Sequence, residues 1–355
     1  MNNRGLIDKL NEEKKLSKEE WRRLIADFLP EDRLYAQSIA SEITEEHFGN
    51  RIYVRGLIEF SNICKNDCLY CGIRCSNTKL CRYRLTEEDI LSCCREGCRL
   101  SYRTFVLQSG ESAYVSSQRF INLIKRIKYE YPDCAVTLSV GEQSRKTYEE
   151  MYAAGAERYL LRHETACKEH YEKLHPEAMS FDNRMRCLRD LRETGFQTGC
   201  GMMVGTPFQT PDTLADDMLF MEKFCPHMAG IGPFIPHKDT PFARYEAGSR
   251  ELTLFLLSLT RIMLPDVLLP ATTALGSLTE DGRIQGVLAG CNVVMPNLSP
   301  QNVRKNYMLY NKKTGTELSA EESVEVLKGQ MKSIDRETVT DRGDHVCFKR
   351  NGAEK

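Results

Sequence analysis

The sequence has no excess of charge of either sign. It contains 49 Lys and Arg residues against 50 Asp and Glu residues, which gives a formal net charge of −1. A strongly basic chain would be drawn to nucleic acid or to an anionic membrane surface by its overall field, and this chain lacks such a field. We therefore expect neither nucleic acid nor a membrane among its partners.

Long apolar runs are also lacking. The most apolar stretch, residues 252–264, is interrupted by Arg261, is followed by Pro265, and is too short for a membrane span. Residues 1–15 are charged and have no apolar core of the kind that a secretion signal needs. We expect the protein to be cytoplasmic.

Cysteine is present at less than the density of a disulfide scaffold. Fifteen of the 355 residues are cysteine, about 4%. In a reducing compartment such residues serve as thiols or metal ligands. The length allows one large domain or two ordinary ones, with a sizeable core in either case.

From about residue 51, short apolar runs alternate with amphipathic helical stretches. Strands that alternate with helices pair in parallel, and eight such units over about 250 residues is the size of a closed barrel. An open doubly wound sheet has a similar pattern, so the count favours the barrel only modestly. We predict a full (β/α)8 TIM barrel. The eight runs are 52–60, 104–107, 135–138, 158–161, 197–204, 228–231, 267–269 and 292–295.

Three parts follow from this pattern. Residues 1–50 form a helical extension, with helices expected at 17–28, where Ser17 and Glu20 make a capping pattern, and at 31–46. Residues 51–310 form the barrel. Residues 311–355 form a polar tail that we expect to hold a helix and an irregular end, and to pack on or near the barrel.

Residue types that can bind ligands or take part in chemistry cluster directly after the apolar runs. Barrel enzymes place their chemistry at the carboxyl ends of the strands, so this clustering agrees with the predicted fold. In strand order, the segments are Cys64, Cys68 and Cys71; Ser109 to Glu111; Ser139 and Glu142; Arg162 to Glu164; Gly205 to Pro207; Pro233 to His237; Thr272 and Thr273; and Pro296 and Asn297.

The first of these segments is a C-x3-C-x2-C loop formed by Cys64, Cys68 and Cys71. Thiolates at this spacing can hold a 4Fe-4S cluster, and three ligands leave one of its irons open. An open iron can bind S-adenosylmethionine and reduce its sulfonium, which releases a 5′-deoxyadenosyl radical. The alternative is a zinc knot with Cys75 or Cys81 as fourth ligand, although zinc sites usually take their ligands in two pairs.

The loop, with the aromatic Tyr70 before its last cysteine, resembles that of the radical S-adenosylmethionine (radical SAM) superfamily. Longer segments resemble, more closely, the HydE family of radical enzymes in FeFe-hydrogenase maturation. The resemblance covers about residues 51–310 and implies a radical SAM enzyme. The segments are 58–62 (IEFSN), 107–111 (LQSGE), 158–165 (RYLLRHET), 230–237 (GIGPFIPH), 270–276 (PATTALG) and 295–297 (MPN).

The resemblance also implies which residues bind S-adenosylmethionine. Backbone carbonyls of Ser109, Gly110 and Glu111 would accept from the methionine ammonium, Arg184 would pair with the carboxylate, and Glu164 would hold the ribose. An exposed helix charge is the alternative for Arg184, and ordinary core is the alternative for Met228 and Ile235. The further cofactor contacts that it implies are Tyr70 and Ser139, with Met228 and Ile235 lining an apolar slot for the adenine beside residues 201–205.

The family's substrate cavity falls at Arg162, Thr272, Thr273 and Tyr307, with Arg55 as a weaker candidate. An arginine inside a barrel is costly unless it meets an anion, which favours an anionic substrate. The resemblance implies a small organometallic substrate, a cysteine-bound iron with carbonyl and cyanide ligands, and other hydrogenase maturation factors as partners. We expect the nearby histidines, His163 and His237, to be structural.

Some members of the family hold a second cluster through cysteines after the final strand. The tail beyond residue 310 contains only Cys347, so we expect one 4Fe-4S cluster, with S-adenosylmethionine as the other cofactor. We interpret Cys93, Cys94 and Cys98 as core residues of a helix. Three alternatives stay open: a mutase of the methylornithine synthase type, a biotin synthase type enzyme, and a non-catalytic iron–sulfur scaffold.

Overall fold

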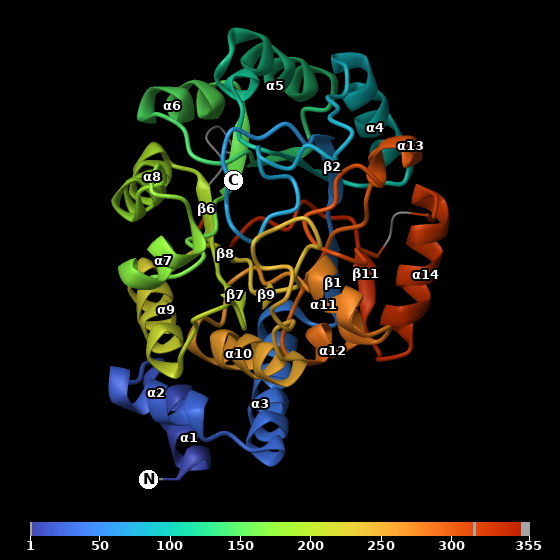
Figure 1. The fold of residues 1–355 in the computed structure, drawn as a ribbon. Helices are drawn as coiled ribbons and strands as arrows, with labels where there is room; N and C mark the ends of the chain where they lie inside the picture. The colour runs from blue at the N-terminus through green and yellow to red at the C-terminus, as the bar shows by residue number, and fades with distance from the viewer. Residues whose placement is uncertain (1, 315–316, 349–355) are drawn as a thin grey trace.

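The computed structural model describes residues 2–314 and 317–348. Three helices come first, α1 (Asn3–Glu13), α2 (Lys18–Ala26) and α3 (Pro30–Phe48), and they lie together beside the main body of the molecule (Figure 1). Ser17 and Glu20 form the capping box that begins α2. Helix α1 is an addition to the sequence prediction, because its three buried apolar residues lie among charged ones.

Six parallel strands form one continuous sheet in the order of the chain. The sheet closes through single bridges: Met228 pairs with Leu268, Pro270 with Val293, and Asn297 with Leu57 in the first strand. All eight predicted runs therefore belong to one ring, and the predicted TIM barrel is confirmed. The six strands are β2 (Gly56–Ser61), β3 (Thr104–Ser109), β4 (Ala135–Ser139), β5 (Ala156–Leu160), β6 (Gln197–Cys200) and β8 (Met228–Ala229).

Short strands extend this ring at both ends. At the carboxyl end, β7 (Met203–Val204) pairs with β9 (Gly232–Pro233), so the fifth and sixth strands reach farther than their neighbours. At the amino end, β1 (Arg51–Val54) runs into β2 and pairs with β10 (Val293–Val294).

Helices surround the ring, and Ser or Thr side chains cap several of them. These caps satisfy backbone N–H groups that a helix start leaves without partners. Along the barrel the structure has α4 (Glu87–Arg99), a 3-10 turn (Ala113–Ser116), α5 (Gln118–Glu130), α6 (Arg145–Ala153), α7 (Lys168–Leu174), α8 (Phe181–Thr194), α9 (Pro211–Phe224), α10 (Arg250–Met263), α11 (Thr273–Leu278), α12 (Gly282–Leu288) and α13 (Gln301–Arg304).

Helix α10 explains the apolar run at 252–264. It lies between the barrel and α3, and every residue from Thr253 to Met263 is buried. Arg261 lies within it, where its guanidinium donates to the carbonyls of Gly290 and Pro265, and burial lowers its pKa to about 10. Among the described residues, no helix is both long and apolar enough to cross a membrane.

The tail contains a helix, α14 (Ala320–Lys332), and also a strand, β11 (Glu337–Val339), that pairs with β1. The expectation of only a helix and an irregular end after residue 310 is therefore wrong. A three-residue strand with a single apolar residue, Val339, gives no periodic signal, and β11 forms because the edge of β1 offers a parallel partner.

After β11 the chain covers the amino-terminal end of the barrel. Arg158, fully buried in β5, donates to the carboxylate of Asp344 (2.6 Å) and to the carbonyl of Arg342 (2.6 Å). Gln197, the first residue of β6, also donates to Asp344 (2.7 Å). The carboxyl end of the barrel, where the cysteine loop begins, is therefore the end left for a site.

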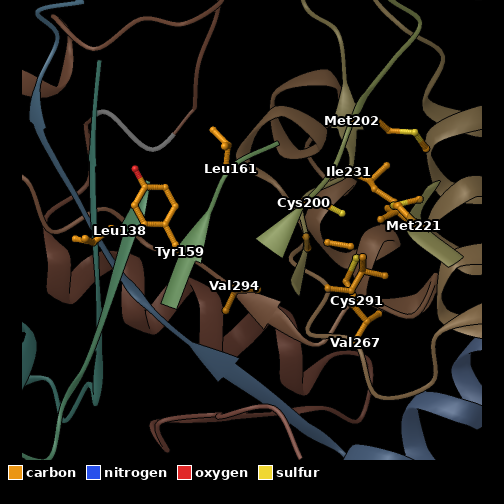
Figure 2. Close-up of a cluster of buried hydrophobic side chains, with 14 of the residues drawn as sticks. Leu138, Tyr159, Leu161, Cys200, Met202, Met221, Ile231, Val267, Cys291 and Val294 are labelled. Atoms are coloured by element: carbon orange, nitrogen blue, oxygen red, sulfur yellow. The ribbon is translucent and has the colours of Figure 1, made fainter. Parts of the chain in front are cut away.

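Apolar and sulfur-bearing side chains fill the core between strands and helices (Figure 2). Cys200 and Cys291 lie within it among Met202, Met221 and Ile231, and both are fully buried. Burial raises the pKa of Cys291 to about 12, as expected of a thiol that acts as a small apolar residue. Cys93 and Cys94 are buried in the same core on α4. In these positions the cysteines serve as core residues.

Candidate active site

The cysteine loop follows β2 and lies over the centre of the ring in the view of Figure 1. Asn62 begins it and donates to the carbonyls of Cys81 (2.9 Å) and Asn306 (2.7 Å), which ties the two ends of the loop to each other and to the segment after α13. Arg82 donates to carbonyls along the loop, among them Ile73 (2.8 Å) and Arg74 (2.6 Å). The chain itself thus holds the loop in place.

The three predicted iron ligands, Cys64, Cys68 and Cys71, are free and half-buried. Burial raises the pKa of all three thiols, and burial together with the charge of Cys64 raises that of Cys71 to about 12. A bound cationic cluster would remove this penalty, because metal ligands bind as thiolates.

A single-ion site is not what the described residues form. No three His, Cys, Asp or Glu side chains among them gather closely enough to hold one ion. Cys75 and Cys81, the candidate fourth ligands of a zinc knot, are both exposed.

The segment Ser109 to Glu111 lies directly against this loop. Gly110 donates to the carbonyl of Ser61 (3.0 Å), and a Cβ on Gly110 would come within 2.7 Å of the Cβ of Cys64, so only glycine fits there. The carboxylate of Glu111 accepts from Lys65 (2.8 Å) and from the backbone N–H of Glu142 (2.7 Å). Glu111 therefore holds the cysteine loop to the next strand end.

Arg184 on α8 is buried and faces the site, so it is not the exposed helix charge that was its alternative. Its Nε donates to Glu142 (2.5 Å) and its Nη1 to the carbonyl of Arg162 (2.6 Å). Burial alone would lower the pKa of Arg184, but Tyr171 and Glu142 outweigh burial and raise it, so the guanidinium stays charged. Among the described residues nothing accepts from its Nη2, which leaves that group for a ligand.

Glu164 has two features that indicate a ligand. Its backbone is left-handed, with φ of 65°, a conformation that costs energy for a residue other than glycine and is common at functional sites. Its Oε1 lies 3.2 Å from Nε of Arg162, while its Oε2 is buried without a partner among the described residues. A buried carboxylate oxygen without a donor is costly unless a ligand supplies one.

Glycines next to Glu164 bring the neighbouring backbones close. Gly201 accepts from the N–H of Glu164 (3.1 Å), and a Cβ on Gly201 would lie 2.2 Å from the carbonyl oxygen of Gly230. The ring of His163 accepts from the N–H of Gly201 (3.2 Å) and faces buried Asp217 (3.3 Å). His163 is therefore engaged in supporting this backbone.

The predicted substrate wall gathers at the sixth strand end. The side chain of Arg162 packs over Gly230, and about one third of it is exposed. The hydroxyl of Thr272 packs against Gly232. Thr272 also caps α11, which begins at Thr273, so the helix orients both threonines.

Tyr307 follows Asn306, whose carbonyl accepts from Asn62 at the start of the cysteine loop. It is fully buried, and burial, followed by charge on Glu59 and smaller contributions from Cys71 and Cys64, raises its pKa. The ring therefore lies near both Glu59 and the cysteine loop. Lys313 of the tail pairs with buried Glu59 and donates to the backbone carbonyl of Tyr307 (3.1 Å). These contacts hold Tyr307 in place.

Four other predicted contacts differ in their placement. The hydroxyl of Tyr70 shares a hydrogen bond with Nε2 of His175 (3.1 Å). The charges of Glu164 and Arg184 act on the pKa of this hydroxyl. Ser139 ends β4 beside β3, and Ile235 follows β9, both half-buried near the strand ends. Met228 lies elsewhere.

Met228 packs with Phe48, Tyr53, Leu268 and Val293 toward the amino-terminal part of the barrel. Its sulfur lies 3.2 Å from Nη1 of Arg55. Met228 is the first of the two residues of β8, and its side chain packs in the amino-terminal part of the core and does not join the cysteine loop. Arg55 therefore lies in the same amino-terminal part of the core, away from the predicted substrate wall.

Sequence reasoning missed several residues that the structure brings to the site. Glu142 pairs with Arg184 across 42 positions, and Lys313 pairs with Glu59 across 254 positions. Tyr310 is half-buried, with Arg162 and Glu59 among the charges that act on it. The strand-end position of Glu142 was a signal for its importance, whereas nothing in the polar tail marked Lys313.

Comparison with known proteins agrees with this geometry. The model of the Radical SAM superfamily matches residues 58–221. The FeFe hydrogenase maturase subunit HydE of Thermotoga maritima is 47% identical over 272 residues, which are 77% of each chain. The chain belongs to the HydE family of the radical SAM superfamily. The resemblance inferred from the sequence motifs is confirmed, and this HydE family member is a radical SAM enzyme.

Other relatives of the HydE family member lie within the superfamily. The 3-methylornithine synthase of Methanosarcina acetivorans is 28% identical over 289 residues, 81% of each chain. The crystal structure of methylornithine synthase (PylB) superposes with a TM-score of 0.83 at 26% identity, over 94% of this chain and 97% of that chain. The maturase HydG gives a TM-score of 0.79 at 18% identity, over 95% of this chain and 76% of that chain, which supports the fold alone.

Family membership implies a 4Fe-4S cluster and S-adenosylmethionine, and the residues present fit both groups. Three half-buried free thiols stand on one loop, with glycine at the point where the next strand end meets it. Among the described residues, the buried Oε2 of Glu164 has no hydrogen-bond donor, and Nη2 of Arg184 has no acceptor. These are the partners that a ribose and a methionine carboxylate supply.

Proposed function

We propose that this enzyme takes part in FeFe-hydrogenase maturation and acts on a cysteine-bound iron that carries carbonyl and cyanide ligands, a precursor of the two-iron subcluster. The observation that carries this proposal is the partly exposed charge of Arg162, whose side chain packs over Gly230, close to the Gly232 that Thr272 contacts. We place Thr273 and Tyr307 beside it as further parts of the substrate wall. A partly exposed cation among barrel strand ends favours a small anion over a long chain or a flat apolar ring.

One 4Fe-4S cluster on Cys64, Cys68 and Cys71 would supply, together with S-adenosylmethionine, the 5′-deoxyadenosyl radical. The chain's own residues bind and orient. Arg184 would hold the methionine carboxylate through Nη2, and Glu164 would accept from the ribose through Oε2. The carbonyls of the Ser109 to Glu111 segment would accept from the ammonium.

The substrate side is organised around Arg162. Its Nε is engaged with Glu164 at 3.2 Å, so one carboxylate links the cofactor wall to the substrate wall. Loss of the guanidinium would remove the counter-charge that places an anionic substrate near the radical. We expect the protein to act in the cytoplasm with other hydrogenase maturation factors.

A cell-free maturation assay tests this function. It combines the reconstituted protein with the other maturation factors, apo-hydrogenase and synthetic cysteine-bound iron dicarbonyl cyanide. Arg162→Ala should keep the cluster and S-adenosylmethionine binding but lose hydrogenase activation by about tenfold or more, and Arg162→Lys should recover part of it. Full activation by Arg162→Ala would remove the anionic-substrate argument.

A further inference from the structure

Polar side chains are buried on both sides of Glu164 in the chain. His163 and Asp217 are fully buried, and Thr165 and His170 are buried as well. They come from three places in the fold: the segment after β5, helix α7 and helix α9. Burial of polar groups costs free energy unless their contacts offset it, so these four residues, which we call the buried polar cluster, require a physical reason.

One oxygen of Asp217 contacts the chain before and after Glu164. Its Oδ1 accepts from the backbone N–H of Ala166 at 2.5 Å and lies 3.3 Å from Nε2 of His163. Asp217 lies on α9, 51 positions farther along the chain than Ala166. A single carboxylate of a distant helix therefore fastens the turn that contains Glu164 on both of its sides.

The next strand end fixes the same turn through its backbone. The carbonyl of Gly201 accepts from the N–H of Glu164 (3.1 Å), and the N–H of Gly201 donates to Nδ1 of His163 (3.2 Å). The hydroxyl of Thr165 accepts from the N–H of Cys167 (3.2 Å). A residue in a left-handed conformation stays there only when its surroundings fix it, and the contacts of this turn do so.

We propose that Asp217, acting with His163, is a positioning residue for S-adenosylmethionine, because it holds Glu164 in the left-handed conformation that leaves Oε2 free for the ribose. The proposal rests on the ribose contact proposed for Glu164. Neither Asp217 nor His163 touches the cofactor in this account. Without the carboxylate of Asp217, the backbone of Glu164 would relax toward a conformation of lower energy, and its side chain would lose the position that meets the ribose.

Two substitutions of Asp217 separate its hydrogen-bonding role from its size. Asp217→Asn keeps an acceptor for the N–H of Ala166, and its amide nitrogen takes the place of Oδ2, which has no partner among the described residues. Asp217→Ala removes the acceptor. If position is what Asp217 supplies, the asparagine should restore what the alanine loses.

The test measures, by calorimetry on the reconstituted holoenzyme, the Kd of S-adenosylmethionine and of its 2′,3′-dideoxy analogue, which lacks the ribose hydroxyls. Asp217→Ala should weaken S-adenosylmethionine by about tenfold, as expected when backbone strain is released, and Asp217→Asn should stay within about twofold of wild type. The dideoxy analogue should bind wild type and Asp217→Ala within about twofold of each other, because it gives Glu164 no hydroxyl to contact. In a Glu164→Gln background, Asp217→Ala should cost no more than about twofold.

The matched control is Asp216→Ala, one position earlier on α9, where the carboxylate pairs with Lys18 (2.6 Å); it should bind S-adenosylmethionine like wild type. Should Asp217→Ala fail to fold, His163→Leu, which removes the ring on the other side of Glu164, should give the same pattern.

Three results would overturn the positioning role. The first is equal weakening of S-adenosylmethionine and the dideoxy analogue by Asp217→Ala, and the second is simple addition of its effect to that of Glu164→Gln, since either would show general damage to the fold. The third is wild-type affinity in both Asp217→Ala and His163→Leu. If the coupling to Glu164 is found but the cell-free maturation assay fails, the proposed function is wrong and the positioning role stands.

Discussion

Nε of Arg162 lies 3.2 Å from Oε1 of Glu164, two residues along the chain, and this contact leaves the second oxygen of Glu164 buried and without a partner. The backbone of Glu164 is left-handed at this strand end, with φ of 65°. The Arg162–Glu164 pair thus lies between the two predicted binding regions, one for the substrate and one for the cofactor. One oxygen faces Arg162, the counter-charge that we propose for the substrate, and the other is free for the ribose contact that we propose.

Glu164→Gln keeps the size of the side chain but can place a donor where the ribose hydroxyl needs an acceptor. We expect S-adenosylmethionine binding to weaken by roughly 1.5–3 kcal/mol, the range for a hydrogen bond to a charged group. Calorimetry on reconstituted protein measures the effect, and iron content should not change. As a control, Glu172→Gln on the exposed side of α7 should leave the affinity unaltered. Equal affinity in all three proteins would show that Oε2 does not meet the cofactor.

Arg184→Ala removes the predicted carboxylate partner and should weaken S-adenosylmethionine by roughly 1.5–3 kcal/mol. Glu142→Gln keeps the arginine and loses only the charge that positions it, so its loss of affinity should be smaller. A double variant measures how far the two effects are coupled. If Glu142→Gln were the more damaging of the two, Arg184 would be acting in the fold and not on the ligand.

The cysteine loop predicts a specific pattern of iron loss. Reconstituted wild-type protein should hold about four irons per chain, and each of Cys64→Ala, Cys68→Ala and Cys71→Ala should lose the cluster absorbance together with cofactor cleavage. Cys75→Ser and Cys81→Ser, which remove exposed thiols of the same loop, should keep about four irons. Nearly eight irons in the wild type would instead reveal a second cluster among the remaining cysteines.

Asp344 predicts a pH dependence of stability. Burial alone would raise the pKa of Asp344, but Arg158 and Arg342 outweigh burial and lower it. Because the folded pKa is depressed, the carboxylate stabilises the fold above the unfolded value of about 4 and loses this contribution as pH falls below it. Asp344→Asn should cost about 2 kcal/mol at pH 7, since it leaves Arg158 buried with weaker partners.

Denaturant unfolding of wild type and Asp344→Asn between pH 3 and pH 7 measures this difference, which should shrink toward acid pH. Asp335→Asn, at an exposed position of the same tail, serves as the control with little change. A difference that stays constant over this range would mean that the carboxyl has the same pKa in the folded and the unfolded protein.

Much of the fold and the main part of the site could be predicted from the sequence for physical reasons. Parallel strands bury both faces and give apolar runs, so the eight units were visible, and thiol spacing is local, so the cysteine loop was too. Pairs across long separations were not visible. Arg184 meets Glu142 only because α8 folds back over the third strand end, and Lys313 reaches Glu59 only because the tail returns to the barrel.

Met228 is a residue that the sequence assigned to the site but that the structure places elsewhere. A methionine suits an apolar slot, and the apolar run 228–231 ends at the site. Met228 is the first residue of that run, however, and its side chain packs with Phe48 and Tyr53 in the amino-terminal part of the core. Depth along a strand decides which end a side chain serves, and the apolar pattern does not encode that depth. The strand β11 was missed for a related reason, because its pairing depends on the edge of β1 and not on its own residues.

The most direct test of the central claim is 5′-deoxyadenosine formation by the wild-type protein, with dithionite as reductant, in parallel reactions with cysteine-bound iron dicarbonyl cyanide and with lysine. The account predicts that the iron complex is consumed and stimulates 5′-deoxyadenosine formation, with lysine giving no more than the background. Consumption of lysine with formation of methylornithine, and no turnover of the iron complex, would contradict the account and assign the protein to the mutases.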